Sequence, residues 1–307
     1  MGRLRLFLLA LCAALLAGAA PVRAAQVALV LSEEGGAFAE AAEAVSSELR
    51  SAGHRIQSIT TPLRAEDGAV LNASALIVTF GTRAAQIIAG LAPRSLLLHT
   101  LLPRSAYERL PQRAEDGRRT SAVFIDQPAN RQIELLRLAL PDWSRVALIV
   151  GRESSELGAR LQANARERRL RPVLEQVGDE NDLYPTLQRV LAEPTILLAI
   201  PDAALYNNRT ISNILLTAYH HRSPVVGFSP AYVKAGALLA LYSTPAQIGQ
   251  QAGEMARHGL AGGSLPAATA PRYFHVGTNP YVARSLGINL EDANTLRERL
   301  ERWENAQ

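Results

Sequence analysis

The sequence has one cysteine, one long apolar run and little net charge. Because Cys12 is the only cysteine, no disulfide can form within the chain, and its stability must come from packing. Beyond residues 6–17, no apolar run approaches the roughly 20 residues that span a bilayer. The net charge is +4, with 32 basic and 28 acidic residues. This balance gives no support to nucleic-acid binding.

Several catalytic and metal-binding motifs are also missing. The sequence contains neither a P-loop nor a G-x-G-x-x-G fingerprint. His220 and His221 are adjacent, so on a helix they point to different faces and cannot share a metal ion. The other histidines have no partners at ligand spacing: His54, His99, His258 and His275. We therefore expect no metal site and no cofactor.

One stretch does approach a catalytic motif. Residues 227–231, Gly-Phe-Ser-Pro-Ala, come within one residue of the nucleophile elbow of serine hydrolases. In that elbow the N–H of the residue after the serine forms half of the oxyanion hole, but Pro230 has no N–H. Losing one such donor costs on the order of 100-fold or more in rate. We therefore expect that Ser229 is not a nucleophile and that the protein is not an enzyme.

The first 24 residues have the layout of a secretory signal peptide. Arg3 and Arg5 precede the apolar run, and small residues lead to a cleavage position after Ala24. Leu11 precedes Cys12, whereas a lipoprotein cleavage site has a small residue there, so we expect no lipid anchor. These features predict export to the periplasm.

Short β-rich runs alternate with amphipathic stretches of helical period. This pattern indicates parallel sheets covered by helices. Strands are expected at 26–32, 55–61, 75–81, 95–101, 121–126, 146–151, 171–177, 195–201, 224–228, 237–243 and 272–277. Helices are expected at 37–52, 82–91, 130–140, 155–169, 183–193, 208–222, 245–260 and 290–305.

The run 224–256 resembles the C-terminal signature of a family of periplasmic solute-binding proteins of ABC transporters, the tryptophan/tyrosine-type substrate-binding proteins. Its pieces are the end of a strand at 228–230, the stretch Val-Lys-Ala-Gly-Ala at 233–237, and a helix rich in Gln and Gly at 245–256. The tail resembles the family's closing segment through Asn279, Ala283, Leu286 and Gly287. The resemblance is good over residues 130–290 and weak before them.

This resemblance implies a type I periplasmic-binding fold: α/β, with two Rossmann-like parallel-sheet domains joined by a three-segment hinge. The corresponding division is a signal peptide at 1–24, an N-terminal lobe of 25–126 plus 245–262, a C-terminal lobe of 127–244 plus 263–290, and a C-terminal helix at 291–307. The hinge segments are expected near 126–128, 243–245 and 262–271. The stretch 62–74 is short for the helix that the family places there, so we expect a reduced N-terminal lobe.

Ligands of open parallel sheets bind beyond the carboxyl ends of the strands. The candidate ligand-binding residues are therefore Ser32, Gly81, Thr82, Thr100, Asp126, Gly151, Ser154, Asp202, Tyr206, Phe228 and Ser229. Helices begin at Gly81–Thr82 and after Gly151–Ser154, and their free N–H groups suit a carboxylate.

The same residues also have structural interpretations. Thr82 and Ser154 would satisfy those N–H groups as helix caps without a ligand. Asp202 would either hold a ligand ammonium or fasten the turn before the next helix. Tyr206 and Phe228 would either clasp an apolar ligand or pack in the core.

The leading functional hypothesis is a monomeric periplasmic protein that captures a small solute, an amino acid or similar carboxylate, for an ABC permease. The second is an orphan binding protein that presents its ligand state to a membrane sensor, which the reduced N-terminal lobe favours slightly. The third is a secreted serine hydrolase that depends on Ser229.

Overall fold

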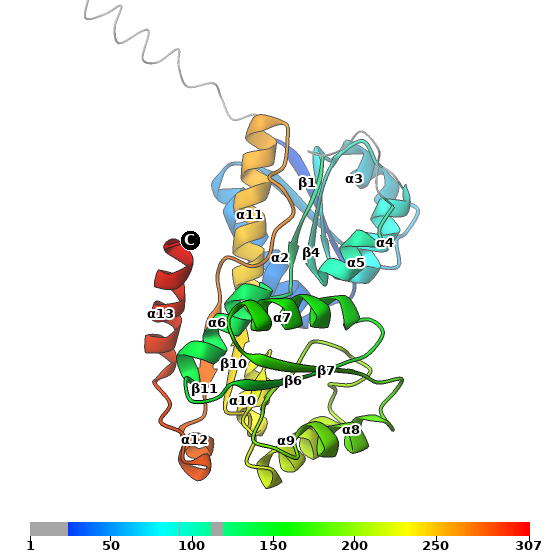
Figure 1. Cartoon of the computed structure of the whole chain (residues 1–307). Coiled ribbons are helices and arrows are strands. Elements are labelled where there is room, and N and C mark those ends of the chain that lie inside the picture. The colour runs from blue at the N-terminus through cyan, green and yellow to red at the C-terminus, as the bar shows by residue number, and fades with distance from the viewer. Residues whose placement is uncertain (1–23, 92, 112–118) are drawn as a thin grey trace, which may run out of the picture.

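The computed structural model describes residues 24–91, 93–111 and 119–307, which form two α/β lobes (Figure 1). Residues 1–23, which include Cys12 and nearly all of the predicted signal peptide, lie outside the described residues. Within the described part, no helix has both the length and the apolar character needed to cross a membrane.

Lobe one is built on five parallel strands in the order β2-β1-β3-β4-β5. They are β1 (Gln26–Leu31), β2 (Arg55–Thr60), β3 (Leu76–Phe80), β4 (Leu96–Leu102) and β5 (Thr120–Phe124). The sheet is covered by α2 (Gly36–Ser51), α3 (Asp67–Ala73), α4 (Thr82–Leu91), α5 (Arg104–Glu108) and α11 (Pro245–Gly262). Because helices cover both faces, every residue of β3 is buried, and four of its five residues are apolar without alternation.

Lobe two contains a six-stranded sheet in the order β11-β10-β9-β8-β6-β7. The strands are β6 (Arg145–Val150), β7 (Arg171–Gln176), β8 (Ile196–Leu198), β9 (Val225–Gly227), β10 (Leu239–Tyr242) and β11 (His275–Thr278). All neighbours are parallel except β10 and β11. The sequence pattern predicted parallel sheets, and the antiparallel edge strand β11 is the one departure.

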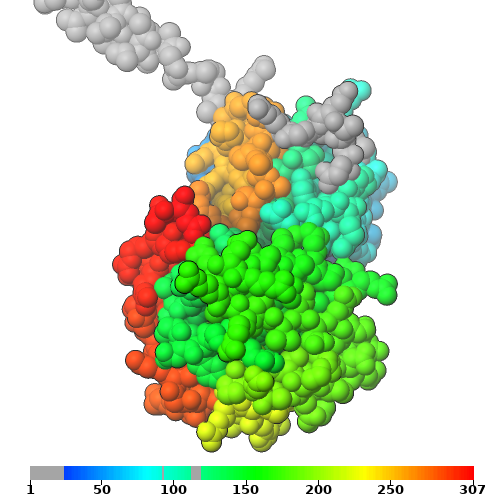
Figure 2. Space-filling model, viewed as in Figure 1, coloured from blue at the N-terminus to red at the C-terminus, as the bar shows by residue number. Residues whose placement is uncertain are grey.

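The helices of lobe two are α6 (Ala129–Ala139), α7 (Ser155–Glu167), α8 (Leu183–Val190), α9 (Ile211–His220), α10 (Pro230–Ala235), α12 (Pro280–Leu286) and α13 (Ala293–Asn305). Helix α13 lies along one side of this lobe and ends near the junction with lobe one (Figures 1 and 2). Leu296 and Leu300 fasten α13 to the core of lobe two.

Helix α11 follows β10 of lobe two in the chain but packs on α2 of lobe one. Its start is fixed by a capping box, in which Thr244 and Gln247 bond each other's backbone N–H. Glycines permit the close packing: a Cβ at position 249 would lie 2.3 Å from the carbonyl oxygen of Ala41. After α11, Thr269 forms a parallel bridge with Val123 of β5 before the chain returns to lobe two.

The predicted α/β fold with two Rossmann-like lobes and three hinge crossings is confirmed. The short stretch between β2 and β3 forms the seven-residue helix α3, and Leu71 of α3 is buried against the sheet. The domain boundaries given above remain a prediction.

Candidate ligand-binding cleft

A cleft lies between the lobes and contains two adjoining cavities. The first, about 260 Å³, is lined from lobe one by Leu101 and Ile125 and from lobe two by Leu157, Pro201 and Phe228. The second, about 290 Å³, extends between Thr82 and Arg109 on one side and Ser154 and Asp202 on the other. Asp126, Leu157 and Pro201 line both cavities.

Asp126 is the half-buried acid at the meeting point of the two cavities, where the chain first leaves lobe one. Its Oδ2 accepts a hydrogen bond from the Arg104 N–H at 2.6 Å. Burial raises the pKa of this carboxyl, and the Arg104 N–H and the charge of Arg160 oppose the rise. The Oδ1 atom accepts no hydrogen bond from another described residue, so Asp126 retains an acceptor for a ligand.

The first cavity has largely apolar walls. Leu101 lines it from a β-bulge, where the register of β4 against β5 shifts and the backbone φ is 52°. A positive φ is strained for leucine, and such strain concentrates at functional sites. On the opposite wall, Phe228 packs on Tyr232 with ring centroids 4.7 Å apart and meets the edge of Tyr206 at 6.4 Å.

Asp202 occupies the space in front of α7. Its Oδ2 accepts from the Ser154 hydroxyl at 2.7 Å and from the Gly151 N–H at 3.2 Å, and its Oδ1 accepts from the Ala204 N–H at 3.0 Å. A Cβ at Gly151 would lie 2.7 Å from Asp202 Oδ2. The protein's own carboxylate therefore fills the place that a ligand carboxylate would take at this helix.

In lobe one, Ser32 likewise accepts a backbone hydrogen bond near the start of a helix. Its Oγ accepts from the Ala84 N–H in the first turn of α4 at 3.0 Å, so Ser32 rather than Thr82 caps this helix. Gly81 has φ 91°, and a Cβ there would lie 2.6 Å from Ser32 Oγ. The N–H groups of Thr82 and Arg83, the first residues of α4, have no acceptor within the helix. Thr82 lines the cleft, so this edge of α4 is open to a ligand.

Ion pairs at the rim balance most of the remaining charge. Arg109 of lobe one reaches across to Glu153 of lobe two, with 2.9 Å between Nη2 and Oε2. Arg160 pairs with Glu156 on α7. Both pairs are largely exposed, so they contribute little stability. Among the described lining residues, Asp126 and Asp202 are the acids that have no cationic side chain bonded to them, and Asp202 already accepts three hydrogen bonds from its own lobe.

The cleft therefore brings together five of the predicted residues: Thr82, Asp126, Ser154, Asp202 and Phe228. Ser32, Gly81 and Gly151 are buried behind it. Thr100 is fully buried and its hydroxyl donates to the Thr79 carbonyl. Tyr206 is a core residue whose hydroxyl donates to the Ile149 carbonyl, and burial raises its pKa.

Ser229 lies at the start of the six-residue helix α10 in extended backbone. Among the described residues, its hydroxyl forms no hydrogen bond with a histidine. The described residues also contain no group of three or more His, Cys, Asp or Glu side chains that could hold a metal ion.

Residues that the sequence reasoning missed are mostly apolar: Leu101, Ile125, Leu157, Leu241 and Ile248. They belong to ordinary core patterns in the sequence, so only the meeting of two lobes reveals them. Leu157 could have been found from the sequence, because it lies in the first turn of α7, the helix that begins directly after the predicted site residue Ser154.

Residues 105–297 match the family model described as ABC transporter substrate binding protein. This match covers more than half of the chain. The chain belongs to this family. A search of curated proteins found no match to this substrate-binding protein.

Solved structures with this fold support the assignment of architecture. A protein from Streptococcus pneumoniae, described as an ABC domain in complex with L-Trp, aligns with a TM-score of 0.61 at 16% identity, covering 87% of this chain and 96% of the other. A substrate-binding protein with adhesive properties from Clostridium difficile, in its ligand-free, open structure, aligns with a TM-score of 0.69 at 15% identity, covering 87% and 96%.

A third structure, a conserved domain protein from Vibrio cholerae, aligns with a TM-score of 0.62 at 18% identity, covering 90% and 98%. At these identities the likeness concerns the fold alone, which is the type I periplasmic-binding fold that the sequence predicted.

Proposed function

We propose that this substrate-binding protein captures an amino acid in the cleft between its lobes and delivers it to an ABC importer. The observation that carries the proposal is Asp126, a half-buried carboxylate at the meeting point of the two cavities that accepts one hydrogen bond from another described residue. A ligand ammonium would match this charge, and the apolar cavity beside it would accept a hydrophobic side chain.

The ligand carboxylate is assigned to lobe one. The free N–H groups of Thr82 and Arg83 at the start of α4 suit an anion. The loop before α7 is unsuitable, because Asp202 already accepts the hydrogen bonds of Gly151 and Ser154 there and its negative charge would repel a second carboxylate. Binding would thus use a cation site at the hinge, an anion site in lobe one and apolar contacts from lobe two.

The pneumococcal protein, which was solved in complex with L-Trp, is consistent with this class of ligand. Export to the periplasm rests on the predicted signal peptide. A membrane sensor in place of a permease would use the same cleft, and genes for a permease and an ATPase beside this one would support the importer. The described residues give Ser229 no partner that would activate it, so a hydrolase is the less favoured function.

A ligand screen tests the proposal. Each of the twenty amino acids and a set of sugars is added to the purified protein, thermal stability is measured, and each hit is titrated by calorimetry. We expect one or a few amino acids to raise the melting temperature and bind with 1:1 stoichiometry. Removing the amino group from the best ligand should abolish binding. A sugar that binds while no amino acid does would contradict the proposal.

A further inference from the structure

The three crossings between the lobes are joined by one chain of hydrogen bonds. Gln127 in the first crossing donates through Nε2 to Ser243 Oγ in the second at 2.8 Å. Ser243 donates in turn to the carbonyl of Tyr273 in the third at 2.5 Å. The crossings therefore cannot move independently of one another without breaking a hydrogen bond.

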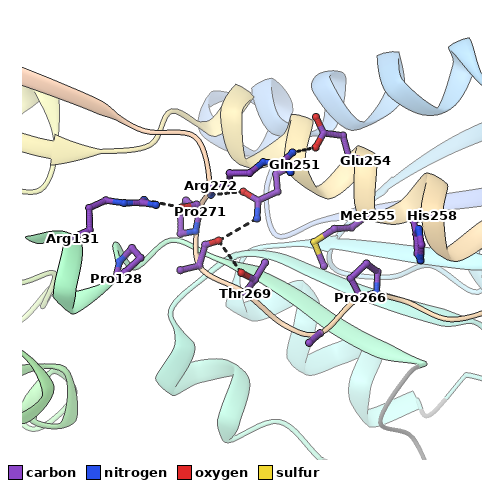
Figure 3. Close-up of a pocket in the computed structure, with 12 residues that line it drawn as sticks. Pro128, Arg131, Gln251, Glu254, Met255, His258, Pro266, Thr269, Pro271 and Arg272 are labelled. Carbon is purple, nitrogen blue, oxygen red and sulfur yellow. Dashed lines mark hydrogen bonds and ion pairs between the residues drawn. The ribbon is translucent and has the colours of Figure 1, made fainter. Parts of the chain in front are cut away.

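Successive residues of the third crossing, residues 270–273, form hydrogen bonds with different lobes. From lobe one, Gln251 of α11 donates to the Ala270 carbonyl at 3.1 Å and accepts from the Arg272 N–H at 2.7 Å. From lobe two, Arg131 of α6 donates to the Pro271 carbonyl at 2.8 Å. Figure 3 shows Gln251 and Arg131 reaching the segment from opposite sides. A change in the angle between the lobes must strain one set of these bonds.

The C-terminal helix α13 holds Arg131 through an ion pair. Glu304, in the last turn of α13, forms a two-pronged ion pair with it, with 2.6 Å from Nε to Oε1 and 3.0 Å from Nη2 to Oε2. The guanidinium also stacks on Phe274, 4.2 Å from the ring centroid. Arg131 is only 5% exposed, and the bidentate geometry fixes its orientation. Its remaining nitrogen, Nη1, therefore points at Gln127 and Pro271.

A cavity of about 630 Å³ lies beside the third crossing, between Pro128, Met255 and Pro266. It is bounded by α11 and by the chain that follows it (Figure 3). This space leaves the crossing room to move when its bonds are released.

We propose that residues 270–273 are a two-sided latch that sets the resting angle between the lobes, and that α13 controls the latch through Glu304 and Arg131. With Glu304 removed, Arg131 loses its fixed orientation and its hold on Pro271. The crossing then follows lobe one, and the lobes sample a wider range of angles. The inference rests on the hinge of the proposed function, but not on any ligand.

The test measures the distance between the lobes in the absence of ligand. Spin labels are attached at Gln86→Cys in lobe one and Asn208→Cys in lobe two, both exposed positions, and pulsed electron resonance gives the distance distribution. Glu304→Gln should broaden the distance distribution, and the population outside the parent's main peak should rise by roughly twofold to tenfold, the range for one hydrogen bond of modest net strength. Gln251→Leu, on the opposite side of the latch, should also change it.

Glu301→Gln is the matched control, because Glu301 lies one turn earlier on α13 and, among the residues that the structure describes, pairs with Arg297 alone. Its distance distribution should equal that of the parent. If Glu304→Gln lowers the melting temperature and leaves the distribution unchanged, α13 merely fastens lobe two and the proposal is overturned. If that variant does not fold, Glu304→Asp keeps the charge but shortens the reach, and an unchanged distribution overturns the proposal equally.

These outcomes are distinct from those of the ligand screen. A protein that binds no amino acid would still show the effect of Glu304 on the distance between its lobes.

Discussion

Two aspartates of the cleft have the same side chain in opposite surroundings. Asp202 is 6% exposed and accepts three hydrogen bonds from its own lobe. Asp126 is half-buried and accepts one from a neighbouring residue. The sequence leaves Asp202 two roles, holding a ligand ammonium or fastening its turn. The geometry favours the fastening role for Asp202 and the binding role for Asp126.

The first prediction follows from the bonds of Asp202. Asp202→Ala leaves the Gly151 N–H and the Ser154 hydroxyl without their acceptor, so the free energy of unfolding should fall by about 1–3 kcal/mol. Affinity for the ligand should stay within about threefold. Thermal melts and calorimetric titration on one sample measure both, with the exposed Asp142→Ala as control. Weaker binding at an unchanged melting temperature would contradict this role.

The second prediction concerns Asp126 and pH. Burial raises the pKa of this carboxyl, so a proton competes with the ligand ammonium at a pH above the usual aspartate range of about 4. Affinity should therefore decrease as the pH falls through that raised pKa. Asp126→Asn should weaken binding by roughly 30-fold or more and remove this pH dependence. Titrations of both proteins from neutral to acidic pH provide the test, and parallel pH profiles would reject it.

Lowering the pH has the opposite effect on the stability of the fold: it weakens ligand binding but favours the folded state through Asp126. Because the folded protein holds the proton of Asp126 more tightly than the unfolded chain, this group stabilises the fold at low pH. That contribution is lost as the pH rises through the raised pKa.

At the scale of elements, two helices of the cleft begin in front of the protein's own polar side chains. Ser32 accepts from the Ala84 N–H in the first turn of α4, and Asp202 accepts from Gly151 and Ser154 just before α7. Both lie at the switch points of the sheets, between β1 and β3 and between β6 and β8, where such folds bind ligands. Asp202 occupies the second position, whereas the N–H groups of Thr82 and Arg83 stay open at the first. The ligand is therefore expected between the start of α4 and Asp126.

The third prediction concerns the packing of α11 on α2. Gly249→Ala would place a methyl group 2.3 Å from the Ala41 carbonyl oxygen, so the helices must separate, and the free energy of unfolding should fall by about 1–3 kcal/mol or more. Gly90→Ala in α4 is the matched control, because nothing lies within 4 Å of its added Cβ. That control should stabilise by about 0.5–1 kcal/mol. Denaturant unfolding of both variants checks the pair, and equal effects would refute the packing argument.

At the scale of the whole molecule, the cleft exists because the chain crosses three times between two sheets. The first crossing carries Asp126 and Gln127, and the second carries Ser243 directly after Tyr242 of β10, and all four residues line the first cavity. The binding residues and the hinge residues are thus neighbours, which couples ligand contact to the angle between the lobes.

The fourth prediction is closure. Small-angle scattering should show the radius of gyration decrease when the amino acid found by the screen is added, because each sheet stays rigid while the crossings bend. The Asp126→Asn protein should show no contraction at the same ligand concentration. An identical scattering profile with and without saturating ligand would exclude a closing mechanism.

The sequence by itself determined the α/β class, the order of nearly all strands and helices and the return of the chain at Thr244-Pro245. These features depend on local periodicity, on caps such as Thr244 with Gln247, and on proline and glycine signals. The helices α3, α5 and α12 were missed because five to seven residues carry too little periodicity. Only the tertiary structure decided which predicted residues meet. Whether a carboxylate is free for a ligand depends on donors distant in the chain, as Gly151 and Ser154 are from Asp202. The apolar walls and the Arg131–Glu304 pair likewise join residues far apart in sequence, and no local pattern records such contacts.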